Sequence, residues 1–454
     1  MKKLGIYVQV PFCQTKCTYC NFHTGVEAKE RFAPYVEAVS REIRWHQRLL
    51  RATGVQWPSR GTDFEGGGCS SAVPLQGDNG RVKAESTGLD VDTVYFGGGT
   101  PSLLEAGQLK RILDAIRETF DGSGHAKTIA VRKGQRRGAE YAEVRREEEQ
   151  EQSDSEGGPY NGVLEEVTLE ADPETVEAEK AAAWARAGIN RVSFGVQSFS
   201  DKELVAAGRM HRRDDVYRAV PILRAAGIEN ISFDLIAGLP HQTKESWRQS
   251  LAELIRLAPE HVSVYLLEVD EGSRLGKELL QGGRRYSAGA VPSDDEMAEF
   301  YEMAQEALGE AGYRHYEISN WAKPAFESKH NLKYWKREPY LGFGAGAHSF
   351  SGRQRWANAH DAAEYVSGID GGRLPVEQLE TVTAEMALEE ELFLGLRQLD
   401  GIDVGRIERE YGVGLRERFG RLAEAGLVEQ HGNVVRLAEG RLSVSNEVFV
   451  ELLR

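Results

Sequence analysis

Short runs of β-branched and aromatic residues alternate with stretches of helical periodicity between residues 5 and 267. The runs predict six strands, at residues 5–10, 91–96, 166–171, 191–196, 230–236 and 261–267. The amphipathic stretches predict five intervening helices, at residues 31–50, 106–120, 176–186, 214–226 and 244–257. Gly188 and Gly227 follow two of these helices at the position where a left-handed cap ends a helix. This alternation of strands and helices predicts an α/β fold built on a parallel sheet or barrel.

Two segments interrupt the alternation, and a different pattern follows it. Residues 51–88 and 122–162 are rich in glycine, serine and charge, so we expect solvated insertions or disordered loops. After residue 383 the chain predicts short helices and a final β-like pair at 427–429 and 434–437, which is typical of a small winged-helix-type domain. The predicted organisation is a strand and helix body over residues 1–312, an aromatic segment over 313–382 and a C-terminal domain over 383–454.

The composition narrows the class of protein. The 454 residues, 41% of them hydrophobic and 28% charged, are typical of a soluble globular protein. No run of about 18 apolar residues is present, so we do not expect an integral membrane protein. The first residues, MKKLGIYVQVPFC, lack the long apolar region of a signal peptide, which predicts a cytoplasmic protein. The net charge of −15, from 56 Lys and Arg against 71 Asp and Glu, disfavours nucleic acid as a partner.

Three of the four cysteines, Cys13, Cys17 and Cys20, form the pattern C-x3-C-x2-C directly after the first predicted strand. The fourth, Cys69, lies in the first predicted insertion and is expected to have no role in the site. A tetrahedral zinc site takes four protein ligands, which this loop reaches only if His23 joins the three thiolates. Three thiolates instead suit a [4Fe-4S] cluster in which one iron has no protein ligand, because ordinary clusters use four. We favour the cluster, with the zinc site as the alternative.

Polar and glycine residues gather where the predicted strands end, and in a parallel barrel all these ends open on one mouth. The sequence GGGTP at 97–101 follows the second strand, where glycines let backbone groups approach a ligand. The other strand-end residues are Glu170, Asp172, Gln197, Asp234 and Glu268. A carboxylate in an apolar strand needs a ligand or a cationic partner such as Arg209, because burying an unpaired charge is costly. Salt bridges that close the barrel are the alternative, but the shared position of these groups favours a ligand site.

The cysteine pattern after a first strand resembles the radical S-adenosylmethionine superfamily. This resemblance implies a partial (β/α)6 barrel and a cluster whose open iron holds S-adenosylmethionine. The motifs YVQVPFCQTKCTYCNF, GGGTP, LEADP, GVQSF, FDLIAGLPHQT and GFGAGAH together resemble the oxygen-independent coproporphyrinogen III oxidase family. Carried onto this sequence, that family's S-adenosylmethionine contacts are Tyr7, Tyr19, Gly98, Gly99, Thr100, Glu170, Gln197, Arg209 and Asp234.

In two features the sequence resembles the HemW-type haem chaperones more than the oxidases themselves. The oxidases carry a further cysteine two residues after the third one, where this chain has Phe22. The sequence HNLKYW at 330–335 matches the H-N-x-x-Y-W signature of the HemW-type group. This similarity implies haem binding and delivery of haem to respiratory proteins, and it is compatible with peripheral membrane contact. A coproporphyrinogen III oxidase is the alternative, whereas a radical enzyme acting on tRNA would need a basic surface that this acidic chain does not predict.

The segment around HNLKYW has the composition of a porphyrin site. Ten of the 48 residues at 313–360 are aromatic, against 9% in the whole chain, and four of the eleven histidines lie there. Haem needs flat apolar walls and an axial ligand, for which histidine is the common choice. The candidate haem contacts are His330 as iron ligand, Asn331 as partner of a propionate, and Tyr334 and Trp335 as walls, with His348 as a second candidate ligand. Core packing of the aromatic residues is the alternative.

Overall fold

One twelve-stranded sheet, whose centre is a partial barrel, forms the framework of the protein. The computed structural model describes residues 3–22, 24–53, 91–120 and 164–453. The parallel strands of the barrel are β1 (Leu4–Val10), β4 (Val91–Gly98), β5 (Glu166–Ala171), β6 (Arg191–Gln197), β7 (Asn230–Ala237) and β8 (His261–Leu266). Each of them pairs with the next along the chain. The predicted α/β partial barrel is confirmed, and its strands coincide with the predicted ones to within two residues.

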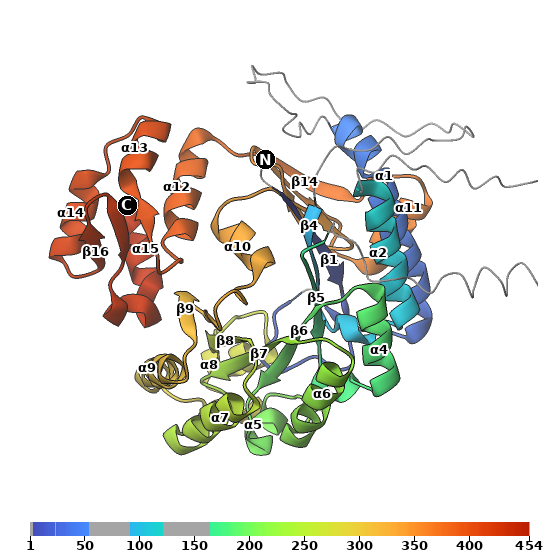
Figure 1. The fold of residues 1–454 in the computed structure, drawn as a ribbon, viewed down its shortest axis with the longest axis horizontal. Coiled ribbons are helices and arrows are strands. Elements are labelled where there is room, and N and C mark those ends of the chain that lie inside the picture. The colour runs from blue at the N-terminus through green and yellow to red at the C-terminus, as the bar shows by residue number, and fades with distance from the viewer. Residues whose placement is uncertain (1–2, 23, 54–90, 121–163, 454) are drawn as a thin grey trace, which may run out of the picture.

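Helices cover the outer face of this barrel (Figure 1). They are α1 (Phe32–Thr53), α2 (Ala106–Phe120), α4 (Ala178–Ala187), α6 (Arg213–Ala225), α7 (Lys244–Leu257) and α9 (Asp294–Glu310). Gly188 has φ 101° at the C-cap of α4, which is the predicted left-handed cap. The predicted insertions fall almost wholly outside the described residues, as do Cys69 and His23.

Side chains of the barrel strands alternate between two environments, because successive residues of a strand point to opposite faces. On β6, Val192, Phe194 and Val196 are fully buried in the apolar core. The residues at the alternate positions of β6 line a cavity in the barrel interior, namely Arg191, Ser193, Gly195 and Gln197. The neighbouring strands repeat the pattern, with Glu170 and Asp234 on the inner face. The barrel therefore has an apolar outer face for its helices and a polar interior.

Residues 314–381 extend the sheet at both edges, which the sequence patterns do not predict. Beyond β8 lie β10 (Asn320–Ala322) and β9 (Arg314–Glu317). Beyond β1 lie β11 (Tyr340–Phe343), β12 (His348–Phe350), β13 (Gln354–Asn358) and β14 (Val376–Thr381). Between the two edges the chain forms α10 (Lys329–Trp335), which lies between the barrel and the C-terminal helices (Figure 1).

The C-terminal part combines helices with a three-stranded antiparallel sheet, the predicted winged-helix-type arrangement. Its elements are α12 (Ala384–Gly395), β15 (Ile402–Asp403), α13 (Val404–Tyr411), α14 (Arg416–Glu424), β16 (Val428–His431), β17 (Val434–Leu437) and α15 (Ser445–Leu453). The predicted β-like pair is present as β16 and β17, and β15 completes the sheet. Hydrogen bonds from Ile318 N to Arg397 O (3.0 Å) and from Leu399 N to Tyr316 O (3.1 Å) join this part to the barrel sheet.

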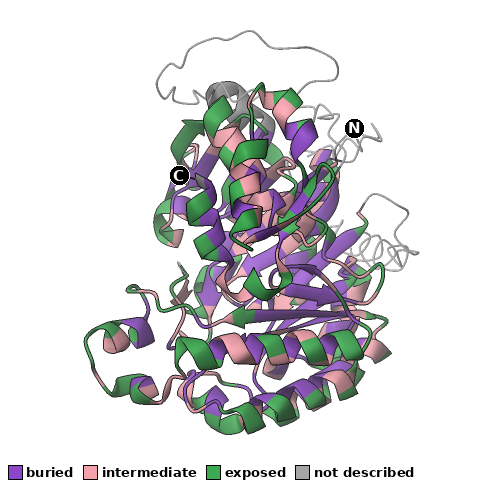
Figure 2. Ribbon diagram, turned by 90° about the vertical axis from the view of Figure 1, so that its left-hand side faces the viewer, coloured by how far each residue is buried: buried purple, intermediate pink, exposed green. Residues whose placement is uncertain are grey.

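Burial follows the layers of the fold (Figure 2). Buried residues concentrate on the strands and on the inner sides of the helices, whereas the outer sides of the helices are exposed. One continuous core of apolar side chains extends from the barrel helices into the C-terminal part. Within the described ranges, no helix is long and apolar enough to cross a membrane.

A buried carboxyl group ties α1 to the extension of the sheet. Glu42 accepts hydrogen bonds from Gly344 N (2.9 Å), Asn358 Nδ2 (2.7 Å) and Tyr365 OH (2.5 Å). Burial raises the pKa of Glu42 to about 7. Because the folded protein holds this proton more tightly than the unfolded chain does, the stability contributed by Glu42 is greatest below its unfolded pKa and decreases as the pH rises to about 7.

We expect Glu42→Ala to reduce the free energy of unfolding by about 2–4 kcal/mol, because three buried donors lose their acceptor. This reduction in the free energy of unfolding should be larger at pH 5 than at pH 8, since only the wild-type protein is stabilised by protonation of Glu42. Urea denaturation followed by near-ultraviolet circular dichroism at the two pH values measures both effects. Glu37→Ala on the same helix is the control, because it removes only an exposed ion pair with Arg111. Equal costs for the two variants would contradict the role of Glu42.

Candidate functional site

A cavity of about 560 Å³ occupies the barrel interior. At the C-terminal ends of the strands it is lined by the loop that carries the three cysteines. At the opposite ends its wall includes Arg191 and His261, which are the first residues of β6 and β8. Asn331 of α10, Arg397 and four residues between 442 and 446 complete the wall from outside the barrel. A cavity of this size accommodates a cofactor or another small molecule.

The cysteine loop is held at the mouth of this cavity. Its ends are β2 (Phe12–Cys13) and β3 (Gly25–Val26), which pair in parallel and so keep the loop compact. Hydrogen bonds from Thr18 N to Ala207 O (3.0 Å) and from Leu275 N to Thr18 O (2.8 Å) hold the loop against the barrel. The free thiols that line the cavity are Cys13, Cys17 and Cys20. The tertiary structure therefore brings the three predicted ligands to one wall.

The three thiols are the candidate ligands of the expected four-iron cluster, which takes its cysteine thiolates on different irons. Among the residues that the structure describes, no three Cys, His, Asp or Glu side chains are grouped so that they could hold one ion. Burial raises the pKa of Cys13 and of Cys20, so bound iron is what would hold them as thiolates. The zinc alternative depends on His23, which lies outside the described residues.

Two glycines allow the end of β4 to pack against the cysteine loop. Gly99 N donates to Val10 O (2.8 Å), and Thr100 N donates to Phe12 O (2.7 Å). A Cβ atom added at Gly99 would stand 2.4 Å from Phe12 O. Gly98 has φ 111°, a conformation that residues with a side chain rarely adopt. The GGGTP sequence thus provides the close contact through which the strand end and the loop form one surface.

Two carboxyl groups face the cavity from β5 and β7. Glu170 accepts hydrogen bonds from Tyr95 OH (2.9 Å) and from the last backbone N–H of β4 (3.0 Å), and burial raises its pKa to about 7. Ser193 Oγ lies 3.3 Å from both carboxylate oxygens of Asp234, whose pKa is also raised by burial. A ligand that donates hydrogen bonds would favour the ionised form of both groups. Neither of them pairs with Arg209, contrary to one of our expectations.

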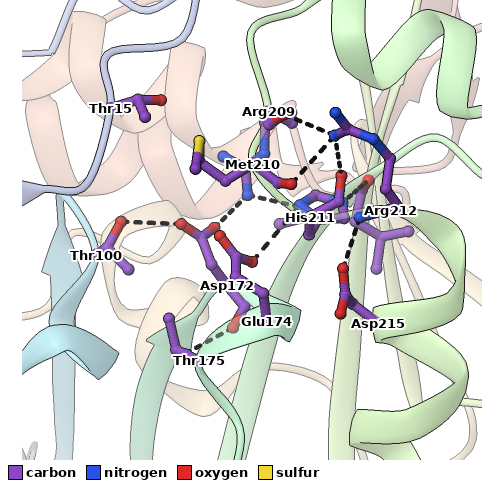
Figure 3. Close-up of polar contacts among 12 residues, drawn as sticks. Thr15, Thr100, Asp172, Glu174, Thr175, Arg209, Met210, His211, Arg212 and Asp215 are labelled. Carbon is purple, nitrogen blue, oxygen red and sulfur yellow. Dashed lines mark hydrogen bonds and ion pairs between the residues drawn. The ribbon is translucent and has the colours of Figure 1, made fainter.

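Arg209 pairs instead with Asp172, directly after β5. Its Nη2 also donates to Gly195 O (2.9 Å), and its Nη1 donates to Cys17 Sγ at 3.4 Å. Thr100 Oγ1 donates to the second carboxylate oxygen of Asp172 (3.1 Å), so this residue joins the end of β4 to the arginine (Figure 3). Asp172 therefore positions the guanidinium beside the cysteine loop.

Eight of the nine predicted S-adenosylmethionine contacts line the cavity. They are Tyr19, Gly98, Gly99, Thr100, Glu170, Gln197, Arg209 and Asp234. Tyr7 lies behind this wall, where its ring stacks on Tyr95 at 6.1 Å and its hydroxyl donates to Gln9 Oε1 (2.7 Å). Gln197 has φ 63° at the end of β6. This left-handed conformation is unfavourable for a residue with a side chain, and such positions concentrate at ligand sites.

The histidine of the HNLKYW sequence is packed and not open to the cavity. His330 is 1% exposed, and its two ring nitrogens contact Thr93 Oγ1 and Tyr334 OH, both at 2.9 Å. Burial lowers the pKa of His330 to about 3, so the ring is neutral. In this structure the ring has no free nitrogen to offer an iron, which differs from our expectation. The reason is that α10 turns His330 toward β4, a direction that sequence spacing does not show.

The other candidates for haem contact lie in different surroundings. Asn331 lines the cavity. Tyr334 packs edge-on against Tyr340, with 4.7 Å between the ring centroids. Trp335 lies beneath the guanidinium of Arg397, at 4.5 Å from the ring centroid. His348, at the start of β12, is exposed.

The sequence patterns do not single out the residues at the inner end of the cavity. Arg191 and His261 begin strands, whereas the predicted ligands lie toward the other ends of the strands. Arg397 follows α12, far from the barrel strands in the sequence, so only the fold brings it to the cavity. A signal for Arg191 is nevertheless present, because it shares the period-two register of Ser193 and Gln197.

Comparison with known proteins relates both parts of the chain to described families. The family model of the Radical SAM superfamily matches residues 81–254, and that of the HemN C-terminal domain matches residues 382–442. The chain is 32% identical over 447 residues to the haem chaperone HemW of Bacillus subtilis, covering 98% of this chain and 97% of the relative. HemW of Lactococcus lactis is 29% identical over 457 residues, covering 100% and 98%.

Among solved structures, the coproporphyrinogen III oxidase HemN of Escherichia coli, a radical SAM enzyme, is similar with a TM-score of 0.72. The match covers 99% of this chain and 90% of that chain, at 20% sequence identity. At this identity the likeness concerns the fold alone. It extends to the C-terminal part as well as to the barrel.

We expect Gly99→Ala to impair assembly of a cluster in the cysteine loop, because the added Cβ atom would meet Phe12 O at 2.4 Å and displace the loop. After anaerobic reconstitution, the content of iron and acid-labile sulfide should be well below that of a full cluster, which holds about four irons per chain. Gly107→Ala is the matched control, since no atom of another segment lies within 4 Å of its Cβ position. Cys17→Ala should lose the cluster and Cys69→Ala should retain it. A full cluster in Gly99→Ala would show that the close contact is dispensable.

Proposed function

The chain belongs to the HemW family of radical S-adenosylmethionine proteins, and we propose that it binds haem and transfers it to an acceptor protein. The Bacillus subtilis and Lactococcus lactis relatives are named haem chaperones and are matched over nearly their whole length. The observation that carries the proposal is that three free thiols, a polar barrel interior and Asn331 of the HNLKYW sequence line one cavity. We take respiratory proteins as the acceptors and the cytoplasm as the place of action, with peripheral contact to a membrane.

We propose that Cys13, Cys17 and Cys20 hold a [4Fe-4S] cluster and that S-adenosylmethionine binds next to it. When bound, this pair supplies one-electron chemistry at the mouth of the cavity. The strand end at 98–100 offers backbone groups to the ligand, and Arg209 supplies a positive charge beside the loop. The remaining proposed contacts are Tyr7, Tyr19, Glu170, Gln197 and Asp234, of which Tyr7 acts through the ring of Tyr95.

We propose the inner part of the same cavity for the haem. Asn331 lines the cavity, and its amide is suited to a propionate. Tyr334 and Trp335 support the wall from behind, and His330 fixes Tyr334 through their 2.9 Å hydrogen bond. Ligation of iron by His330 would require the ring to leave both of its partners, so we assign this residue a positioning role.

A coproporphyrinogen III oxidase is the second candidate function. The similarity to the Escherichia coli enzyme in fold supports it, because the two chains share the barrel and the C-terminal part. Against it stands Phe22, which occupies the position of the further cysteine of the oxidases and is 65% exposed at the cavity mouth. The full-length relatives also carry the name of the chaperone and not of the oxidase.

We expect S-adenosylmethionine to bind about tenfold more tightly at pH 8 than at pH 6 to the cluster-loaded protein. The pKa of Glu170 is about 7, so the carboxylate that accepts hydrogen bonds from the ligand becomes available over this interval. Glu170→Gln should weaken binding and make the pH dependence flatter, as measured by calorimetry. Glu299→Gln is a control, because this exposed residue of α9 lies outside the cavity and pairs with Lys244. Wild-type affinity and pH dependence in Glu170→Gln would make Glu170 a structural residue.

We expect the anaerobic protein to bind haem in an absorbance titration and to leave coproporphyrinogen III unchanged in the presence of S-adenosylmethionine and a reductant. The physical reason is that the cavity offers a polar wall for an acidic porphyrin, while Phe22 replaces the cysteine of the oxidases. Transfer is measured by mixing the haem complex with an apo-cytochrome and following the absorbance of the acceptor. Formation of protoporphyrinogen would instead favour the oxidase, and absence of haem binding would refute the chaperone.

A further inference from the structure

We propose that Arg191 forms a carboxylate-binding subsite at the inner end of the barrel cavity, and that this subsite takes a propionate of the bound tetrapyrrole. The inference rests on the proposed haem-binding function and names the group that recognises the acidic edge of the ligand. Neither the family motifs nor the predicted S-adenosylmethionine contacts include Arg191.

Arg191 is a buried cation that faces the cavity. It begins β6, lines the cavity and has 1% of its surface exposed. Its Nε is buried and has no hydrogen-bond partner within the part of the chain that the structure describes. A guanidinium cannot become neutral by losing its proton, in contrast to a buried lysine or histidine. Leaving such a charge without a partner is costly, so an anion from outside the chain would stabilise this arrangement.

The groups around Arg191 do not supply that anion. His261 contacts Ser232 Oγ and Tyr316 OH, both at 2.8 Å, and burial lowers its pKa well below the usual range. The carboxyl of Asp234 is hydrogen-bonded to Ser193. The charge of Arg191 lowers the pKa of Asp234, but burial outweighs this effect and leaves the pKa raised. Among the described residues no carboxylate forms an ion pair with Arg191, so its permanent positive charge is open to a carboxylate of a ligand.

A second cation at the cavity, Arg397, has a carboxylate partner, although its Nε is also buried without a hydrogen bond among the described residues. Its Nη2 lies 3.7 Å from Glu317 Oε2, and its guanidinium covers the ring of Trp335 at 4.5 Å. Of the described arginines in the cavity wall, Arg191 is accordingly the one that forms no ion pair with a carboxylate. Asn331 lines the same cavity and can donate to the same carboxylate.

The position of Arg191 separates it from the cluster end of the cavity. Arg191 and Gln197 are the two ends of β6, and six residues of strand span about 20 Å. The amino acid part of S-adenosylmethionine, held at the cysteine loop, therefore does not need Arg191. A porphyrin carries its propionates on one edge, and a guanidinium binds a carboxylate through two parallel hydrogen bonds. Arg191 would thus hold the acidic edge inward and leave the rest of the ring toward the mouth.

The test compares haem with haem dimethyl ester, in which both propionates are neutral, on the full-length cluster-loaded protein. The readout is the ratio of the two dissociation constants from absorbance titrations. We expect the wild type to favour haem by about tenfold or more, and Arg191→Gln to reduce this ratio to near one. Arg191→Lys should keep an intermediate ratio, because the charge remains while the two-pronged geometry is lost. Arg256→Gln is the matched control, since Arg256 is an exposed residue of α7 whose partner is Glu253.

If Arg191→Gln keeps the wild-type ratio of the two dissociation constants, the proposed subsite is wrong. The same holds if both compounds bind more weakly by an equal factor because the fold is disturbed. A ratio near one in the wild type would also overturn it, while haem binding itself would still support the proposed function. Absence of binding of either compound to the wild type would refute the proposed function, and the subsite with it. Iron content and circular dichroism of each variant show whether the cluster and the fold are retained.

Discussion

The barrel depends on one constraint, the period-two alternation of side chains on its parallel strands. Each strand must be apolar on the face that packs against the helices, and this leaves every second position free for other chemistry. On β6 the apolar positions are Val192, Phe194 and Val196, while Arg191 and Gln197 face the interior. Because the neighbouring strands are paired in parallel register, their inner residues form a continuous polar lining. A polar cavity inside an apolar shell is the result.

The charged groups of this lining are only partly compensated by neighbouring residues, which suits the binding of a ligand. Burial raises the pKa of Glu170 and of Asp234, and hydrogen bonds from neighbouring hydroxyls only partly offset it. Arg209 is compensated by Asp172, so its charge is fixed beside the cysteine loop. Nε of both arginines lacks a hydrogen-bond partner among the described residues, but Arg191 at the other end also forms no ion pair with a carboxylate there. The two arginines therefore differ in role. Arg209 belongs to the framework of the site, whereas Arg191 is proposed to bind an anionic group of the ligand.

Segments outside the barrel complete the site. The helix α10 and the C-terminal part lie where the strands of the barrel leave the cavity wall incomplete, and Asn331 and Arg397 contribute to that wall. The same packing explains why His330 is not an open imidazole, since Thr93 and Tyr334 occupy its two nitrogens. A family signature can thus mark residues that shape a wall as well as residues that touch the ligand.

The sequence alone determined the barrel strands, most of their helices and the cysteine loop, because these depend on local periodicity and on close spacing of Cys13, Cys17 and Cys20. It also indicated the carboxylates at the strand ends, since all parallel strands open on one mouth. Only the tertiary structure decided that Arg209 pairs with Asp172 and that His330 turns to Thr93. It also decided that the short strands of residues 314–381 join the sheet edges. These features are contacts between distant segments, and such contacts depend on side-chain direction and strand register, which local periodicity does not contain.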